Sequence, residues 1–334
     1  MQENLIFVIG PPRSGSTMLQ RMLGSHSAIH THPEPHIITP LAHLGYYDNV
    51  EKAPYDHINA AEAIREYVED LPAGEQDYLD ACRAYTDVLY GRMLEKSGKR
   101  MLLDKTPAYG LVLPFLGKLY PRAKYVVLTR HPLAVLSSYA ESFFEGDLDA
   151  ALAFNPILER YVPAMARFMR QTGVPFHRIR YEDLVKAPVE RMAAIFAFLG
   201  LENEEGAVEY GKHQHVVKSY GDPKAGQEQR PTTKSVSKWA VELASDEHKL
   251  ELARAAVAPL DPEDLKLWGY DKDRLFDKLA EVGDRQPVKD RKWLTNSYRL
   301  KRKVFMALRR NIHGSGFGRA VKRVKYFCDV LLRE

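Results

Sequence analysis

Apolar and polar positions follow two different periodicities along the chain. Four short runs are rich in apolar and β-branched residues, as expected of strands covered on both faces: residues 4–10, 100–105, 123–130 and 176–184. Between these runs, apolar residues recur at helical spacing in residues 60–70, 76–96, 132–144 and 157–171. Strands that alternate with helices predict an α/β fold, in which a parallel β-sheet is flanked by helices.

The pattern beyond residue 185 predicts further helices and one long loop. Pro188 and Gly200 frame a compact amphipathic helix, and a last helix is expected near residues 246–257. Residues 211–235 are polar and have no useful periodicity. We expect a functional loop or lid there, because the apolar pattern resumes at Trp239.

The chain changes character from about residue 285. Residues 285–334 hold fifteen Lys and Arg against three Asp and Glu, a net charge of +12, which leaves −8 on the preceding residues out of a total of +4. Apolar residues recur every four positions, with basic residues on the other faces, at Leu300, Val304, Leu308 and Ile312. A second basic amphipathic helix is expected over about 318–332. We therefore predict a globular domain over residues 1–275 and a basic helical tail over residues 285–334.

Length and composition fit a protein with a substantial core. The chain has 334 residues, of which 45% are hydrophobic, enough for one large or two ordinary domains. It contains no run of about 18 apolar residues, and its N-terminus shows neither a cationic leader nor a small-residue cleavage site. We expect a soluble, cytoplasmic protein. Cys82 and Cys328 are too few and too far apart for a disulfide framework or a cysteine metal site.

A glycine-rich loop follows the first apolar run. Residues 10–17 read GPPRSGST and lead into TMLQRMLGSH, which has helical spacing. Such a turn aims backbone N–H groups into one concavity at a helix N-terminus, where an anion is favoured. Glycine loops also occur as plain turns. The cationic Arg13 and the hydroxyls of Ser16 and Thr17 favour an anion site here.

The loop lacks the lysine of a nucleotide phosphate loop, since Ser16 stands in its place. Kinases and NTPases need that lysine and a magnesium ion to neutralise charge on the outer phosphates. A sulfuryl group carries less charge than a phosphoryl group. One cation, Arg13, and several neutral donors therefore suffice without a metal, and the sequence favours a phosphosulfate donor.

These residues resemble a known family. PRSGSTML is similar to the 5'-phosphosulfate loop of the sulfotransferases that use 3'-phosphoadenosine 5'-phosphosulfate (PAPS), whose fold is like that of the P-loop nucleotide kinases. The resemblance covers roughly residues 5–270. It implies PAPS as donor and adenosine 3',5'-bisphosphate (PAP) as product. It also implies that the 5' end of the donor is bound by Arg13, Ser14, Gly15, Ser16 and Thr17.

The stretch YVVLTRHPLAVLSSY is similar to the 3'-phosphate motif of the same family. Arg130 leaves the end of a strand and Ser138 lies about two turns into the next helix, so a fork of donors and a hydroxyl can hold a second phosphate. Without the motif, Arg130 would be interpreted as part of a surface ion pair.

Two later matches imply further donor contacts. RYEDLV is similar to the late strand and helix of the family and implies Tyr181 near the nucleotide, although a lone tyrosine at a strand end is otherwise a core residue. SVSKW resembles the loop that closes over the donor in the protein-tyrosine branch, which implies Ser237 and Lys238 as contacts. It departs from the R-K-G-x-x-G-x-W loop of the cytosolic small-molecule branch.

The histidine base of the cytosolic small-molecule branch is missing. That branch uses K-T-H, where this chain has Lys105, Thr106 and Pro107. The protein-tyrosine branch uses a glutamate twenty-one residues after the loop arginine, and this count gives Glu34. The resemblance implies Glu34 as base and Lys105 as donor of a proton or hydrogen bond to the departing phosphate. His36 is a candidate to share the base role or position the acceptor, and the alternatives are a loop cap for Glu34 and a surface position for His36.

The histidines His26, His30, His32 and His36 suggest zinc by their number. No acidic or cysteine partner completes a ligand spacing, so we predict no metal. PEPH and DKTPAY resemble segments of the sulfotransferase domains that sulfate β-hydroxyacyl chains, but they are too short to identify the acceptor. Small-molecule, lipid-like, β-hydroxyacyl and tyrosyl hydroxyls all stay open.

Two other function classes remain open. One is an ATP- and magnesium-dependent small-molecule or nucleotide kinase, and the other is a non-catalytic polyanion- or membrane-binding protein. The basic tail predicts peripheral contact with an anionic membrane or a protein partner. Nucleic-acid binding ranks lower, because aromatic residues are few and no recognition motif is present.

Overall fold

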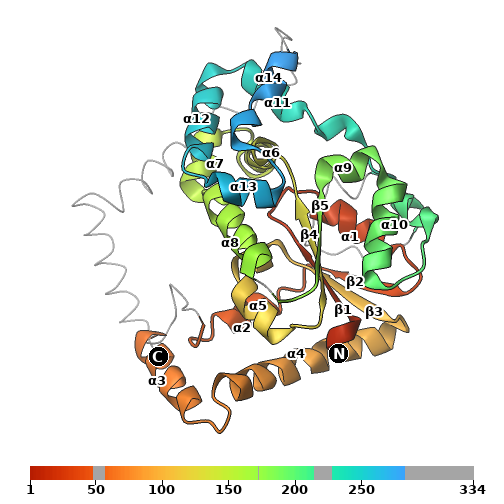
Figure 1. Cartoon of the computed structure of the whole chain (residues 1–334), viewed down its shortest axis with the longest axis vertical. Helices are drawn as coiled ribbons and strands as arrows, with labels where there is room; N and C mark the ends of the chain where they lie inside the picture. Colours follow the sequence, from red (N-terminus) through yellow and green to blue (C-terminus); the bar gives the residue numbers. More distant parts are fainter. Residues whose placement is uncertain (48–56, 172, 214–227, 283–334) are drawn as a thin grey trace, which may run out of the picture. The chain divides into compact units, whose positions relative to one another are not determined.

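The computed structural model describes residues 1–47, 57–171, 173–213 and 228–282 (Figure 1). All of them lie within the unit Met1–Arg285. The predicted basic tail and most of the predicted loop at 211–235 fall outside the described residues. Among the described residues, none of the helices combines the length and the apolar character that crossing a bilayer demands.

Five parallel strands form the sheet in the order β2-β3-β1-β4-β5. They are β1 (Leu5–Ile9), β2 (Ile29–Pro33), β3 (Met101–Lys105), β4 (Lys124–Thr129) and β5 (Phe176–Arg180). The central strand β1 is fully buried, and its Phe7 pairs with Asp104 on one side and Tyr125 on the other. The predicted α/β fold with a parallel sheet is confirmed.

Two details of the strand prediction are wrong. The strand expected at 176–184 ends at Arg180, because residues 181–186 form the helix α9. Glu182 and Asp183 lie in the first turn of that helix, where carboxylates are favoured by the helix dipole. The strand β2 was not predicted. It lies at the edge of the sheet, and only Ile29 among its residues is buried, so its sequence IHTHP has no apolar pattern.

Alternate residues of β1 point to opposite faces of the sheet. Ile6 and Val8 join a core with α1 (Ser16–Gly24), α9 (Tyr181–Lys186) and α10 (Pro188–Leu199). On the other face, Phe7 contacts four tyrosine rings, those of Tyr90, Tyr109, Tyr120 and Tyr125. This face is covered by α4 (Glu75–Ser97), α5 (Leu113–Leu119) and α8 (Ile157–Gln171) (Figure 1).

The remaining helical segments connect these layers. They are η1 (Gln2–Asn4), α2 (Ile38–Ala42), α3 (His57–Glu69), η2 (Pro107–Leu111), α6 (Pro132–Phe144), α7 (Leu148–Phe154), η3 (Glu205–Val208), η4 (Tyr210–Lys212), η5 (Thr233–Ser235), α11 (Lys238–Ala244), α12 (Glu247–Val257), α13 (Pro262–Trp268), η6 (Lys272–Arg274) and α14 (Asp277–Val282). The helix expected near 246–257 is therefore not the last one. Asp261 and Pro262 start α13 by the usual cap and first-turn chemistry, which the apolar pattern does not show.

The strand order places a topological switch point between β1 and β4. The chain leaves β1 into α1 and leaves β4 into α6, and these helices lie on opposite sides of the sheet (Figure 1). Ligands of open α/β sheets bind beyond the carboxyl ends of the strands at such a point. The loops after Ile9 and Thr129 are therefore the place to look for a site.

Candidate active site

The loop between β1 and α1 has a backbone that only a glycine permits at one position. Gly15 has φ 93°, and a Cβ atom there would lie 2.5 Å from the ring of Tyr181. Arg13 also has a positive φ, 68°. The turn brings the loop to the N-terminus of α1, where backbone N–H groups and the helix dipole favour an anion.

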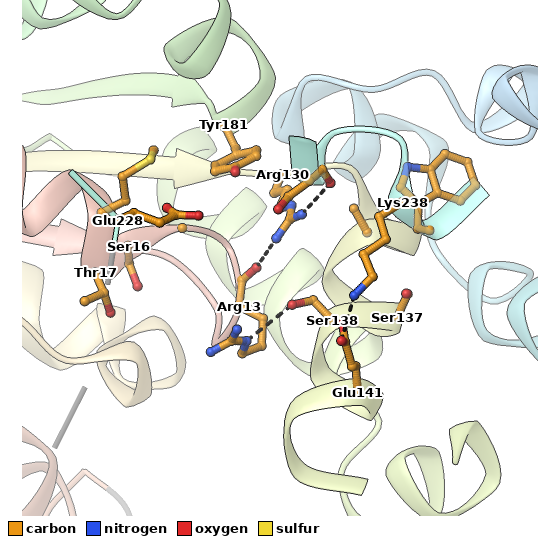
Figure 2. A pocket seen from close by; sticks show the side chains of 15 residues that line it. Arg13, Ser16, Thr17, Arg130, Ser137, Ser138, Glu141, Tyr181, Glu228 and Lys238 are labelled. Atoms are coloured by element: carbon orange, nitrogen blue, oxygen red, sulfur yellow. Dashed lines mark hydrogen bonds and ion pairs between the residues drawn. The ribbon is translucent and has the colours of Figure 1, made fainter. Parts of the chain in front are cut away.

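A cavity of about 200 Å³ opens at this loop (Figure 2). It is lined by the loop and the start of α1, by one face of α6 as far as Glu141, by the start of α9, and by the start of α11 with the segment before it. Eight residues expected to contact the donor line it: Arg13, Gly15, Ser16, Thr17, Arg130, Ser138, Tyr181 and Lys238. Ser14 is completely buried beneath the loop, and Ser237 precedes α11 without being part of the lining.

Arg130 emerges from the end of β4 and is 7% exposed. Its Nη1 donates to the carbonyl of Arg13 at 2.9 Å and its Nη2 to the carbonyl of Ser235 at 2.9 Å. Its guanidinium lies 4.4 Å from the ring centroid of Tyr181. Burial lowers the pKa of Arg130 from its usual value, but a guanidinium stays protonated at neutral pH. The buried charge therefore favours an anion in the cavity.

A buried cluster holds the backbone around Arg130, and sequence reasoning missed it. Trp268 Nε1 donates to the carbonyl of Arg130 at 2.9 Å, and the backbone N–H of His131 donates to Glu182 Oε1 at 3.1 Å. The ring of His131 stacks on Trp239 with centroids 4.3 Å apart. Burial lowers the pKa of His131 to about 3, so this ring is neutral at physiological pH.

Polar contacts on α6 connect the two motifs. Arg13 Nε donates to Ser138 Oγ at 3.3 Å, so the hydroxyl of the second motif contacts the cation of the first (Figure 2). Lys238 Nζ pairs with Glu141 at 2.7 Å across the cavity. Glu141 and Glu228 line the cavity and were not expected, since a carboxylate carries no signal for an anion site.

Glu34 and Lys105, the expected acid–base pair, lie in contact. Lys105 Nζ is 2.5 Å from Glu34 Oε1 and donates to Thr17 Oγ1 at 3.3 Å. Lys105 is fully buried, and Glu34 is 16% exposed. His36 Nε2 is 3.7 Å from Glu34 Oε2. Neither Glu34 nor Lys105 lines the cavity. Thr17 lines the cavity and also contacts Lys105, so it connects the cavity with the Glu34–Lys105 pair.

Backbone strain is concentrated at these positions. Among the non-glycine residues that the structure describes, positive φ occurs at Arg13, Glu34, His36 and Glu145. The first three are expected site residues. Strained backbone persists where surrounding contacts enforce it and is common at active sites.

The histidine cluster does not assemble a ligand set within the described part of the chain. There, no group of three His, Cys, Asp or Glu side chains is placed to hold a metal ion. His26, for example, is buried and bonds through Nε2 to the carbonyl of Glu202 at 3.0 Å. That the reaction needs no metal stays a prediction from the sequence.

Comparisons with known proteins identify the family. Residues 5–205 match the family described as the sulfotransferase family. The nodulation protein NoeE of Sinorhizobium fredii is 30% identical over an alignment of 341 residues, and the match covers 94% of this chain and 75% of that protein. Protein-tyrosine sulfotransferase 1 of Danio rerio is 22% identical over an alignment of 287 residues, and the match covers 80% of this chain and 72% of that protein.

A solved structure has the same fold. The sulfotransferase domain of the Synechococcus PCC 7002 olefin synthase superposes with a TM-score of 0.50 at 23% identity, covering 80% of this chain and 94% of that one. The family match over residues 5–205 includes the loops that follow β1 and β4 and the Glu34–Lys105 pair. The chain therefore belongs to the sulfotransferase family and is a sulfotransferase enzyme.

Proposed function

We propose that the enzyme transfers the sulfuryl group of PAPS to a hydroxyl of its acceptor. The observation that carries this proposal is that Arg13 and Arg130, which follow different strands, line one cavity together with the N-terminus of α1. Arg130 Nε, a buried polar atom of a lining residue, has no partner among the described residues. The residues present therefore fit a ligand with an anion at each end.

The two motifs bind the two ends of the donor in this proposal. Arg13, the loop N–H groups and the hydroxyls of Ser16 and Thr17 bind the phosphosulfate end. Arg130, Ser138 and Lys238 bind the 3'-phosphate. PAPS supplies an activated sulfuryl group attached to a phosphate leaving group. Fixed cations and dipoles around the reacting centre stabilise the charge that develops there without reorganisation.

Glu34 acts as the general base. Its carboxylate accepts the proton of the acceptor hydroxyl as the acceptor oxygen bonds to sulfur and the bond from sulfur to the phosphate oxygen breaks. Lys105 Nζ contacts both Glu34 and Thr17, so it can orient the Glu34 carboxylate and donate a hydrogen bond to the departing oxygen beside Thr17. His36 lies beside the second carboxylate oxygen and is placed to orient Glu34 or the acceptor.

The donor assignment is tested by thermal denaturation with ligands. A ligand that binds the native state alone raises its apparent stability. We expect PAP to raise the melting temperature and ADP with magnesium to leave it unchanged, and Arg13→Ala and Arg130→Ala to abolish the PAP effect. Stabilisation by ADP with magnesium but not by PAP would reject PAPS as the donor.

The catalytic assignment is tested by Glu34→Gln. We expect this variant to bind PAP as the wild type does and to lose about 10²- to 10⁴-fold in turnover, the usual contribution of general base catalysis. Turnover equal to that of the wild type would reject Glu34 as the base. The acceptor is to be found by screening hydroxyl compounds with labelled donor, since the fold does not determine it.

A further inference from the structure

The segment that carries Glu34 and His36 is strained and attached at both ends to β3 and the turn that follows it. At the near end, Pro33 is in register with Lys105, and Gln20 of α1 donates to Thr31 Oγ1 at 2.8 Å and to the His32 carbonyl at 3.0 Å. Beyond Pro33 the backbone turns through positive φ at Glu34 and His36. Residues in such conformations relax unless both flanks are fixed.

The far end is attached at Ile38, the first residue of α2. Its backbone N–H has no intrahelical carbonyl available at that position. It donates instead to the hydroxyl of Tyr109 at 3.3 Å. Tyr109 lies in η2, four residues after Lys105, and is fully buried. The same short stretch therefore holds Lys105 and the end of the segment.

Asp104 orients the hydroxyl of Tyr109. Tyr109 donates to Asp104 Oδ2 at 2.9 Å, which leaves a lone pair of the phenol oxygen to accept from Ile38. Tyr90 donates to the same carboxylate oxygen at 2.7 Å, and Thr106 donates to Oδ1 at 3.1 Å. Asp104 is 1% exposed, so this carboxylate depends on these donors for its solvation.

We propose that Tyr109, oriented by Asp104, is a positioning residue that anchors the segment 34–38 and keeps the Glu34 carboxylate beside Lys105. The inference rests on the proposed function for the role of Glu34. It assigns a task to a fully buried tyrosine that is not among the residues lining the cavity. A displacement of about 1 Å at a reacting group costs up to ~10²-fold in rate, so a single hydrogen bond at Ile38 is enough to matter.

The structure offers a matched pair of variants. Tyr109→Phe removes both the hydrogen bond to Asp104 and the acceptor of the Ile38 N–H. Tyr90→Phe removes an equivalent bond to the same Asp104 oxygen from an equally buried ring, but leaves Ile38 untouched. An effect of Asp104 solvation or of core packing alone appears in both variants, whereas an effect of the anchor appears only in Tyr109→Phe.

The experiment measures amide hydrogen exchange and turnover in the full chain. We expect Tyr109→Phe to speed exchange in residues 34–38 by about 10-fold or more, because the Ile38 N–H loses its acceptor. We expect PAP formation from PAPS, measured with 4-nitrophenol and with water as acceptor, to fall by roughly 10- to 100-fold in kcat, while the Kd of PAP stays within about 2-fold. We expect Tyr90→Phe to leave the exchange rate of residues 34–38 and kcat within about 3-fold of the wild type.

Exchange that is unchanged in Tyr109→Phe, or that rises equally in both variants, overturns the inference. A fall in kcat of the same size in both variants also overturns it. The proposed function fails by a different result, namely PAP formation that is insensitive to Glu34→Gln. In that case the exchange measurement still decides whether Tyr109 anchors the segment.

Discussion

At the scale of single residues, Gly15 in the loop between β1 and α1 cannot be replaced without cost. Its positive φ and the nearby ring of Tyr181 both exclude a larger side chain. Gly15→Ala places a methyl group 2.5 Å from the ring of Tyr181 in a left-handed backbone. We expect it to weaken PAP binding by about 10-fold or more and to lower the free energy of unfolding by roughly 1–3 kcal/mol. Isothermal titration and urea denaturation measure these quantities.

Gly98 supplies the control for that prediction. It has φ 64°, and no atom lies within 4 Å of the place that an added methyl group would take, so Gly98→Ala carries the backbone strain without the contact. We expect it to lower stability by about 1 kcal/mol and to leave PAP affinity unchanged. Equal PAP affinities in Gly15→Ala and the wild type would show that the loop is a plain turn.

Glu141 is expected to weaken donor binding. Its carboxylate lines the cavity and pairs with Lys238, a cation that the proposed function assigns to the 3'-phosphate. Glu141→Gln removes a like charge and releases the lysine. A unit charge at several Å in a partly solvated site is worth about 1 kcal/mol, so the Kd of PAP should fall by roughly 3- to 10-fold, and less at high salt.

The control for Glu141 is Glu159→Gln on α8, an exposed carboxylate that is not part of the lining. It should leave the Kd of PAP unchanged. Weaker PAP binding in Glu141→Gln would mean that Glu141 serves chiefly to orient Lys238, and would contradict the prediction.

Asp104 makes the stability of the fold depend on pH in a defined window. Burial raises the pKa of Asp104 from 3.8 to about 6, and the hydrogen bonds from Tyr90, Tyr109 and Thr106 and the charge of Lys105 only partly offset this. The folded state therefore binds more protons than the unfolded state between these values. The contribution of Asp104 is largest below pH 3.8 and is lost as the pH rises through about 6.

Asp104→Asn removes this dependence. The free energy of unfolding of the variant relative to the wild type should increase by about 2–3 kcal/mol between pH 4 and pH 6.5. Urea denaturation at the two values measures the change. The control Asp87→Asn removes a half-buried carboxylate that also accepts from a tyrosine, Tyr120, and measures what the loss of such a hydrogen bond alone does at the two pH values. A pH-independent difference for Asp104→Asn would contradict the raised pKa.

At the scale of elements, the sequence predicted a strand correctly where the strand's own apolar pattern was sufficient to locate it. The runs at β1, β3 and β4 are buried on both faces, so continuous apolar character located them within one residue at each end. The edge strand β2 has one buried residue and was missed, because its position depends on pairing with β3 and on Gln20 rather than on its own pattern.

The site residues also divide into those that a sequence motif marks and those that only the fold brings together. The resemblance to the sulfotransferases pointed to Arg13, Arg130 and Glu34, and the structure places the first two in one cavity and the third in contact with Lys105. The residues that support them, such as Trp268 and Tyr109, act through contacts across 138 and 71 positions of sequence. A single sequence carries no local signal for such contacts, since each of these residues is also an ordinary core aromatic.

At the scale of the whole molecule, the chain combines an acidic domain with a basic C-terminal segment. The net charges of −8 and +12 come from adjoining stretches, so acidic and basic residues are segregated along the sequence. The division into a sulfotransferase domain over residues 1–275 and a tail over residues 285–334 stays a prediction from the sequence. It implies that the tail can be removed without loss of the anion sites.

The tail is predicted to bind anionic membranes. Each Lys or Arg near a negatively charged surface contributes about 1 kcal/mol, and the apolar residues at every fourth position give such a segment a face to insert. We expect the full chain to sediment with vesicles that contain phosphatidylserine, but not with phosphatidylcholine vesicles, and binding to weaken with salt. A chain ending at Asp284 should lose this binding and keep the wild-type Kd for PAP.

A full-length variant with Gln at 299, 301, 302 and 303 tests charge without changing length, because it removes four cations from the first half of the tail. It should bind phosphatidylserine vesicles more weakly than the wild type and with a smaller dependence on salt. If the shortened chain binds as well as the full chain, the tail does not mediate membrane contact. If the shortened chain loses PAP affinity instead, the tail belongs to the donor site and the proposed division is wrong.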